Sequence, residues 1–236
     1  MGAAGSGERD GDPTANGGMG RVVYRSFRDL QQLLQQDGRT ITAEAVEYPA
    51  TAVPAEGDLL GWAGFISSVD AGTAALDGQY TSFAQRCPNT KVVLAGYSQG
   101  AMVVHRNLHA LADSPNLAAA LLVADGDRIP DDTAISMGSV TAIPGRGRGV
   151  AQEWPILAHA PTAKLPPSVG SRTISVCDIG DPVCDYDPDS ESVTQAAEAI
   201  HMSYAVAARG GHAWTWPLYQ LLGASPAARQ LVLAGS

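Results

Sequence analysis

Positive charge, aromatic side chains and cysteine are all scarce in this 236-residue chain. Lys and Arg total 15 against 24 Asp and Glu, which gives a formal net charge of −9, and the basic residues form no cluster. Proteins that bind a phosphate backbone use such clusters, so we expect no nucleic-acid partner. The three cysteines allow one disulfide bond and leave one thiol over.

Long hydrophobic runs are absent from the sequence as well. The most apolar stretch, residues 117–124, lies between Asn116 and Asp125 and is far shorter than the roughly 20 residues of a membrane helix. We therefore expect no membrane span. The first residues also lack the basic and apolar regions of a secretory signal peptide, so the sequence itself does not predict export.

The composition instead predicts one globular domain over residues 1–236. Apolar residues make up 45% of the chain and charged residues 17%, a balance that supports a packed core. Apolar residues from Val23 to Leu34 recur at intervals of four, three and four. This spacing places them on one face of a helix over about 21–36.

Strands and helices are predicted to alternate along the chain. The expected strands are 41–48, 92–95, 118–124 and 172–178, and the expected helices are 21–36, 63–86, 99–112 and 191–208. Strands separated by helices favour a mostly parallel sheet covered on both faces, which is a three-layer α/β/α fold. We expect the Pro- and Gly-rich stretch at about 129–170 to form a surface excursion or lid, and the tail at about 209–236 to add a helix.

The clearest functional motif is Gly96-Tyr97-Ser98-Gln99-Gly100, a G-x-S-x-G sequence between an expected strand and an expected helix. On such a turn the serine hydroxyl stands out at the carboxyl edge of the sheet, and the small glycines let strand and helix pass closely. The backbone N–H of Gln99, at the start of the helix, can face an oxyanion. A chance match is the alternative in a glycine-rich chain, but this context favours a nucleophilic Ser98.

A nucleophilic serine needs a histidine that accepts its proton and a carboxylate that orients the histidine. In a hydrolase fold of this kind, the acid and then the histidine follow the serine in the chain. Asp178 and Asp181 are favoured as the acid because they close the last clear strand, but the pattern does not choose between them. The full set of downstream candidates is Asp125, Asp127, Asp178, Asp181, His159, His201 and His212.

Further motifs flank the serine turn. They are Ala101 after the turn, Cys87-Pro88 before it, and the downstream run Cys177-Asp178-Ile179-Gly180-Asp181-Pro182-Val183-Cys184. Together with the serine motif they resemble the cutinase family of serine esterases, in its actinobacterial type, over residues 5–208. In that family the acid follows a Gly inside the Cys-x6-Cys loop, which implies Asp181. The histidine opens a His-x-x-Tyr sequence, which implies His201, with His212 as the second candidate.

The resemblance also implies a disulfide bond and an oxyanion hole. A bridge between Cys177 and Cys184 would close the loop around Asp181 and hold it in position. Family members carry an Arg-Gly-Ser/Thr-x-Glu sequence after their first strand, and its hydroxyl donates to the oxyanion. Gly5-Ser6-Gly7-Glu8 matches the end of that sequence, with Ala4 in place of the arginine. Ser6 is therefore implied as a donor beside Gln99.

The start of the chain departs from the family pattern. In the family, the equivalent of Cys87 is bridged to a cysteine just before the first strand, and only Met1 to Ala4 precede Gly5 here. We therefore expect the first strand to be missing and Cys87 to be unpaired. A further upstream segment would supply both the strand and the secretion signal that the resemblance implies.

These features predict a secreted, monomeric serine esterase that uses no cofactor. Its expected substrates are short- to medium-chain acyl esters, among them lipid or cutin-like polyesters. A metal is not expected, because Cys-x6-Cys suits zinc poorly, and His105 and His109 lack the glutamate of a zinc-protease helix. The alternatives are cleavage of a thioester or peptide, or an impaired cutinase-like chain that binds lipid or a partner.

Overall fold

The computed structural model describes residues 1–55, 58–154, 157, 160–189, 193–206 and 211–223. Within these residues, parallel strands form a five-stranded sheet in the order β1-β2-β3-β5-β4. The strands are β1 (Gly2–Ala3), β2 (Val92–Tyr97), β3 (Leu117–Val123), β4 (Ile135–Met137) and β5 (Thr173–Val176). The α-helices are α1 (Arg21–Gln36), α2 (Leu59–Arg86), α3 (Gln99–Leu108), α4 (Pro167–Gly170), α5 (Gln195–Ser203) and α6 (Thr215–Gly223). Short 3-10 helices are Ala15–Gly18, Ser139–Ala142 and Val150–Gln152.

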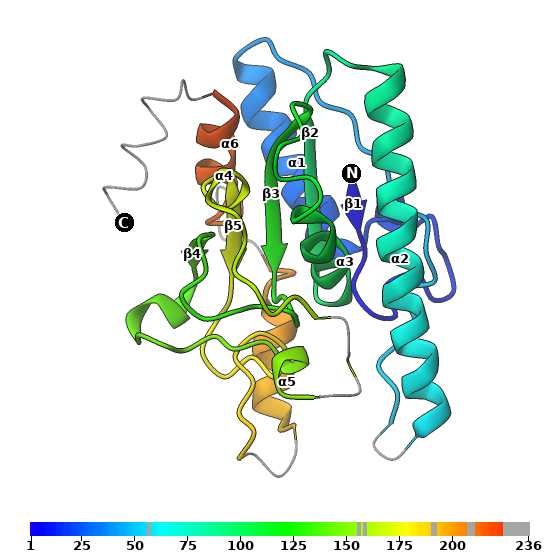
Figure 1. The fold of residues 1–236 in the computed structure, drawn as a ribbon, viewed down its shortest axis with the longest axis vertical. Coiled ribbons are helices and arrows are strands. Elements are labelled where there is room, and N and C mark those ends of the chain that lie inside the picture. Colours follow the sequence, from blue (N-terminus) through cyan, green and yellow to red (C-terminus); the bar gives the residue numbers. More distant parts are fainter. Residues whose placement is uncertain (56–57, 155–156, 158–159, 190–192, 207–210, 224–236) are drawn as a thin grey trace.

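Helices cover both faces of the sheet, which confirms the three-layer α/β/α prediction (Figure 1). α3 packs on one face with α2 outside it, and α1 and α6 pack on the other. Successive residues of β3 point in opposite directions. Leu122 therefore lies in the core with α2 and α3, whereas Leu121 lies in the core with α1 and α6.

Several elements lie where the hydrophobic pattern predicts them. α1 has the expected bounds, and Val23, Leu30 and Leu34 are buried on its inner face. The tail contains α6, and residues 224–236 lie outside the described residues. β4 lies within the 129–170 stretch and pairs with β5, so part of this stretch belongs to the sheet. The expected lid stays a prediction.

The expectation of a missing first strand is wrong. β1 lies at the edge of the sheet, with Gly2 opposite Ala95 and Ala3 opposite Gly96 of β2. The pattern failed here because a strand of only two residues has no detectable period. The expected strand at 41–48 is also wrong, since it contributes only an isolated bridge between Ala45 and Gly2. Because β1 has only two residues, the 41–48 segment finds too short a neighbour to form a strand beside it.

By length and composition alone, α2 is long and apolar enough to cross a membrane, with a mean hydropathy of 1.2 over 18 residues. It is the one such helix among the described residues. The core helices of globular proteins pass the same test. Phe65, Val69 and Leu76 are buried on one side of α2, in the core that it shares with α3. The expected absence of a membrane span therefore stays a prediction.

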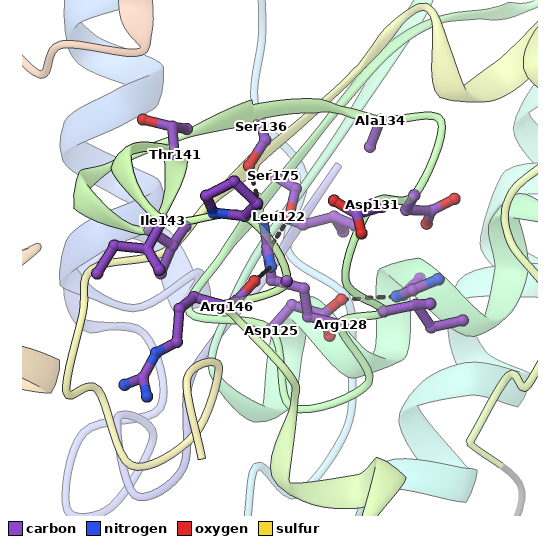
Figure 2. Close-up of a pocket in the computed structure, with 16 residues that line it drawn as sticks. Leu122, Asp125, Arg128, Asp131, Ala134, Ser136, Thr141, Ile143, Arg146 and Ser175 are labelled. Carbon is purple, nitrogen blue, oxygen red and sulfur yellow. Dashed lines mark hydrogen bonds and ion pairs between the residues drawn. The ribbon is translucent and has the colours of Figure 1, made fainter. Parts of the chain in front are cut away.

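A cavity of about 210 Å³ opens beside β3, β5 and β4. Arg128 crosses it, and its guanidinium donates to Ser175 Oγ at 3.2 Å and to Ser136 Oγ at 2.7 Å (Figure 2). A further donation to the carbonyl of Gly147 ties the 143–149 loop to this group. Burial lowers the pKa of Arg128 from its ordinary value. The hydrogen bonds of Arg128 thus connect two strands to the loop beside them.

Candidate active site

Ser98 lies on a strained turn between β2 and α3. Its backbone has φ 54° and ψ −120°, in the positive-φ region that residues with a side chain rarely adopt. Ser98 N donates to Val123 O on β3 at 2.9 Å, and Ser98 O accepts from Ala101 N of α3 at 2.9 Å. The turn is therefore fixed to a strand on one side and to a helix on the other.

The two glycines of the motif are required by close backbone approaches. A Cβ atom at Gly96 would lie 2.1 Å from the carbonyl oxygen of Gly100, and one at Gly100 would lie 2.2 Å from the carbonyl oxygen of Ala3. Both separations are far below van der Waals contact. Only glycine at these positions lets β1, β2 and α3 come together around Ser98.

Three side chains from distant parts of the sequence form a continuous series of hydrogen bonds. His201 Nε2 lies 3.1 Å from Ser98 Oγ. His201 Nδ1 lies 3.1 and 3.0 Å from the two carboxylate oxygens of Asp181. The Asp181 side chain is fully buried, whereas the His201 side chain is 16% exposed. This is the geometry in which an imidazole can accept a proton from a serine hydroxyl while a carboxylate orients it.

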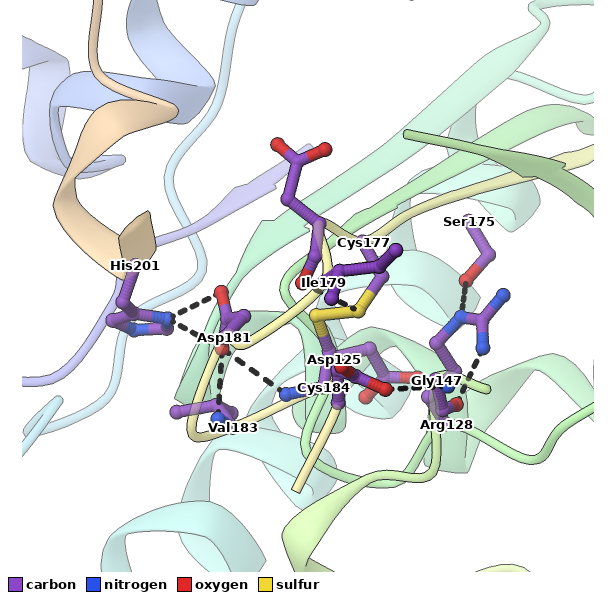
Figure 3. The surroundings of a disulfide bond; sticks show 12 residues. Asp125, Arg128, Gly147, Ser175, Cys177, Ile179, Asp181, Val183, Cys184 and His201 are labelled. Carbon is purple, nitrogen blue, oxygen red and sulfur yellow. Dashed lines mark hydrogen bonds and ion pairs between the residues drawn. A yellow bond between two sulfur atoms is a disulfide. The ribbon is translucent and has the colours of Figure 1, made fainter. Parts of the chain in front are cut away.

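The loop that carries Asp181 holds the carboxylate in place. Asp181 Oδ1 accepts from Val183 N at 2.7 Å and from Cys184 N at 3.2 Å. Figure 3 shows these bonds beside the disulfide between Cys177 and Cys184, which closes the loop. The disulfide that the resemblance implies is therefore present. Cys87 has no disulfide partner among the described residues.

The other candidate acids are occupied by different partners. Asp178 Oδ1 accepts from both the N–H and the hydroxyl of Ser139, at 2.8 and 2.9 Å. Asp125 and Asp127 contact side chains of α3 instead, namely His105 at 2.6 Å and Arg106 at 2.7 Å. Burial raises the pKa of Asp127 to about 6, against the lowering effect of Arg106. Of these acids, Asp181 is the one that reaches His201.

Among the described candidate histidines, only His201 has a hydrogen bond with Ser98. His212 Nδ1 lies 2.8 Å from Asp29 Oδ2, and His159 lies outside the described residues. His105 and His109 stack with their ring centroids 6.5 Å apart. Among the described residues, no group of three or more His, Cys, Asp or Glu side chains could hold a metal ion.

The two candidate oxyanion donors lie at the same edge of the sheet as Ser98. Gln99 is buried, and its side chain accepts from Ser68 Oγ at 3.0 Å and donates to Thr51 O at 3.1 Å. Ser6 follows β1, and its hydroxyl is buried with no hydrogen-bond partner among the described residues. The role of Ser6 and Gln99 as oxyanion donors stays a prediction.

Glu8 and Tyr97 support the site, and sequence reasoning assigned no role to either. The Glu8 carboxylate accepts from Gly5 N at 2.7 Å and from Arg21 N at 2.8 Å, which joins the Ser6 turn to the start of α1. The Tyr97 hydroxyl donates to the carbonyl of His201 at 2.8 Å. Glu8 occupies the last position of the quoted motif, which is a usable signal. No sequence signal pairs Tyr97 with a residue so far along the chain.

The parallel sheet with helices on both faces, and the strained serine turn after β2, define an α/β-hydrolase fold. The chain belongs to the cutinase family, because the sequence model described as Cutinase matches residues 11–221. The resemblance drawn from the motifs is therefore confirmed.

Curated relatives share part of their sequence with this chain. Cutinase 11 of Verticillium dahliae is 33% identical over 171 residues, which are 69% of this chain and 52% of that protein. Phospholipase Culp4 of Mycobacterium tuberculosis is 29% identical over 174 residues, which are 74% of this chain and 62% of that protein. The chain thus spans between about half and 62% of the length of these relatives.

Solved structures share the fold. A cutinase-like protein from Cryptococcus sp. has a TM-score of 0.61 at 22% identity, over 92% of this chain and 89% of that one. The catalytic core domain of an acetyl xylan esterase from Trichoderma reesei has a TM-score of 0.58 at 22% identity, over 94% of this chain and 95% of that one. These similarities support the α/β-hydrolase fold.

Proposed function

We propose that this chain is a serine hydrolase of carboxylic esters, with Ser98 as nucleophile, His201 as general base and acid, and Asp181 as the orienting carboxylate. The observation that carries the proposal is the hydrogen-bonded series from Ser98 Oγ through His201 to Asp181, at 3.1 and 3.0 Å. Two further observations support the proposal. A strained turn holds Ser98 at the edge of the sheet, and the chain belongs to the cutinase family.

In the first half of the reaction, Ser98 Oγ attacks the ester carbonyl carbon while its proton passes to His201 Nε2. The resulting imidazolium keeps its Nδ1–H on Asp181, whose buried carboxylate stabilises the positive charge. The carbonyl oxygen becomes an oxyanion, which the Gln99 N–H and the Ser6 hydroxyl stabilise by hydrogen bonds. When the tetrahedral intermediate collapses, the C–O bond to the alcohol breaks, and His201 gives its proton to the leaving alkoxide.

In the second half, water replaces the alcohol. His201 takes a proton from the water, whose oxygen attacks the acyl-serine carbonyl, and the same oxyanion donors act again. Collapse of the second intermediate releases the carboxylic acid and returns the proton to Ser98 Oγ. No redox step occurs, and the proton transfers balance over the cycle.

We propose short- to medium-chain acyl esters, including lipid esters, as substrates. Met202, which follows His201, is 53% exposed, and Val206 is 74% exposed. Val53 is 58% exposed and lies two residues from Thr51, whose carbonyl binds the Gln99 side chain. Exposed apolar side chains close in sequence to His201 and to Thr51 favour an acyl chain over a charged substrate. The disulfide favours secretion, because such bonds persist in oxidising compartments.

Hydrolysis of p-nitrophenyl butyrate by the chain and by its Ser98→Ala variant tests the proposal. We expect the chain to release nitrophenolate with saturation kinetics, and the variant to lose at least about 10³-fold in kcat. A matched panel with the p-nitroanilide distinguishes ester from amide cleavage. Equal rates for the chain and the variant would refute the proposal. If the folded chain binds butyrate esters without hydrolysing them, an impaired lipid-binding protein replaces it.

A further inference from the structure

The helix that carries His201 lies at the surface of the molecule. No residue of α5 (Gln195–Ser203) is buried. A helix normally takes its position from a packed apolar face. Besides the direct contacts of His201 with Tyr97 and Asp181, the contacts at the C-terminal end of α5 can fix the position of His201.

Tyr204, the residue that caps α5, makes the first of these contacts. It is 3% exposed, and its hydroxyl accepts from Asp178 N at 2.8 Å. Its ring packs edge-on against His201, with the centroids 6.4 Å apart. Through its side chain, Tyr204 joins α5 to the loop that carries Asp181.

The backbone of Tyr204 is held by a second carboxylate–imidazole pair. His212 Nε2 lies 3.1 Å from the carbonyl oxygen of Tyr204, and His212 Nδ1 lies 2.8 Å from Asp29 Oδ2. The same Asp29 oxygen accepts from the backbone N–H of His212 at 3.0 Å. Asp29 belongs to α1, so this pair fixes the end of α5 to a helix that packs on the sheet.

The surroundings of His212 give it one orientation. Its side chain is 1% exposed and stacks on Trp214, with ring centroids 4.5 Å apart and 24° between the planes. Trp214 Nε1 donates to Ser26 Oγ at 2.9 Å, and Arg25, one turn before Asp29, donates to the carbonyl of Ala205. α1 thus contributes several polar contacts to the segment that follows His201.

We propose that Asp29 and His212 are positioning residues for catalysis, which hold His201 in line with Ser98 and Asp181 through the carbonyl of Tyr204. The inference rests on the proposed function, because it assigns them to the same reaction. Neither residue touches the substrate. They act by keeping the distances on both sides of the His201 ring near 3 Å. A displacement of about 1 Å at such a centre is enough to cost on the order of a hundredfold in rate.

The test compares variants that keep different contacts of the Asp29–His212 pair. His212→Phe keeps a ring that can stack on Trp214 but loses both hydrogen bonds. His212→Gln is the conservative variant, because its amide can still donate to the carbonyl of Tyr204. Asp29→Ala removes the acceptor of both His212 N–H groups. It serves if His212→Phe does not fold, with the same expected loss of kcat. The control is His105→Gln, which removes another buried pair, His105–Asp125, at 2.6 Å.

We expect His212→Phe to lower kcat on p-nitrophenyl butyrate by about ten- to a hundredfold with little change in KM. His212→Gln should recover part of the loss. His105→Gln should lower the melting temperature about as much as His212→Phe does, and it should leave kcat unchanged. The proposal is overturned if kcat of His212→Phe, per folded molecule, stays within about twofold of the parent, or if the control loses as much kcat.

A second measurement does not depend on activity. The proton that His201 Nδ1 shares with Asp181 should give a low-field proton NMR signal, identified by its loss in His201→Gln. The signal should shift or broaden in His212→Phe and stay in place in His105→Gln. If the parent chain proves inactive on esters, the proposed function fails and this signal alone decides the positioning role. An unchanged signal in His212→Phe would overturn it.

Discussion

The phenol ring of Tyr97 stacks on the imidazole of His201, with the centroids 5.1 Å apart and 26° between the planes. The Tyr97 hydroxyl donates to the backbone carbonyl of His201 at 2.8 Å. Burial, together with the charges of Glu8 and Asp181, raises the pKa of this phenol. The residue immediately before the candidate nucleophile therefore contacts both the ring and the backbone of the candidate base.

Replacing Tyr97 by Phe separates these contacts. The ring stays stacked and the hydroxyl is lost, so we expect a loss of stability of about 1 kcal/mol. Because the carbonyl of His201 is then less restrained, kcat should fall several-fold. Thermal unfolding and steady-state kinetics measure the two effects. Tyr97→Ala removes the stack as well and should be worse in both; equal effects for Phe and Ala would mean that the stack contributes nothing.

The choice between Asp178 and Asp181, which the residue pattern alone leaves open, becomes a kinetic prediction. Asp181→Asn cannot stabilise the imidazolium of His201, and we expect kcat to fall by about 10³- to 10⁴-fold. Asp178→Asn loses only part of its bonding to Ser139, so its kcat should stay within severalfold of the parent. Steady-state hydrolysis of one ester by both variants is sufficient. The reverse order of losses would assign the acid to Asp178.

The glycine of the serine turn gives a stability prediction with a matched control. A Cβ at Gly96 would lie 2.1 Å from the carbonyl oxygen of Gly100, so Gly96→Ala must force strand and helix apart. We expect a loss of about 3 kcal/mol, measured by urea unfolding, which is the upper end of the usual cost of an overpacked site. Gly78→Ala on α2 meets no atom within 4 Å and should be neutral or stabilising by up to about 1 kcal/mol. Similar losses for both would contradict this explanation.

Much of the site could be predicted because its key residues lie in local motifs. The G-x-S-x-G motif shows the two glycines, Gly96 and Gly100, that the tight turn needs. The Cys-x6-Cys spacing indicates the loop that contains Asp181. Resemblance to a known family was still needed to choose Asp181 and His201, because residue spacing does not report which side chains meet in space.

The failures have physical causes as well. β1 is two residues long and has no period, so it escaped detection, whereas 41–48 has a strand-like pattern but only a very short neighbour to pair with. β4 and the contacts that Tyr97 and His212 make went unassigned for a different reason. Tyr97 contacts His201, and His212 contacts Asp29 and the carbonyl of Tyr204. These partners lie far along the chain or in other elements, and such contacts leave no pattern in the sequence.

Stability should depend on pH through His105. Burial lowers the pKa of this histidine, but the charge and hydrogen bond of Asp125, with Asp127 and Asp132 adding, outweigh burial and raise it. A raised pKa in the folded state stabilises the fold fully below the unfolded value of about 6.5. That contribution is lost as the pH rises through the folded value.

We therefore expect the free energy of unfolding to fall as the pH rises from about 6.5 through the folded pKa of His105. The fall should be smaller in His105→Gln, which has no titrating group at this position. Urea unfolding at a series of pH values gives the two curves. Parallel curves for the parent and the variant would show that His105 does not contribute.

Covalent labelling with a p-nitrophenyl alkylphosphonate tests the central claim most directly. Ser98 Oγ should attack phosphorus and displace one nitrophenolate, leaving a single stable adduct detectable by mass spectrometry. The account predicts one adduct per chain, located on the peptide that contains Ser98, absent in Ser98→Ala and strongly slowed in His201→Gln. A folded chain that forms no adduct, or forms it on another residue, would contradict the assignment of Ser98 as the nucleophile.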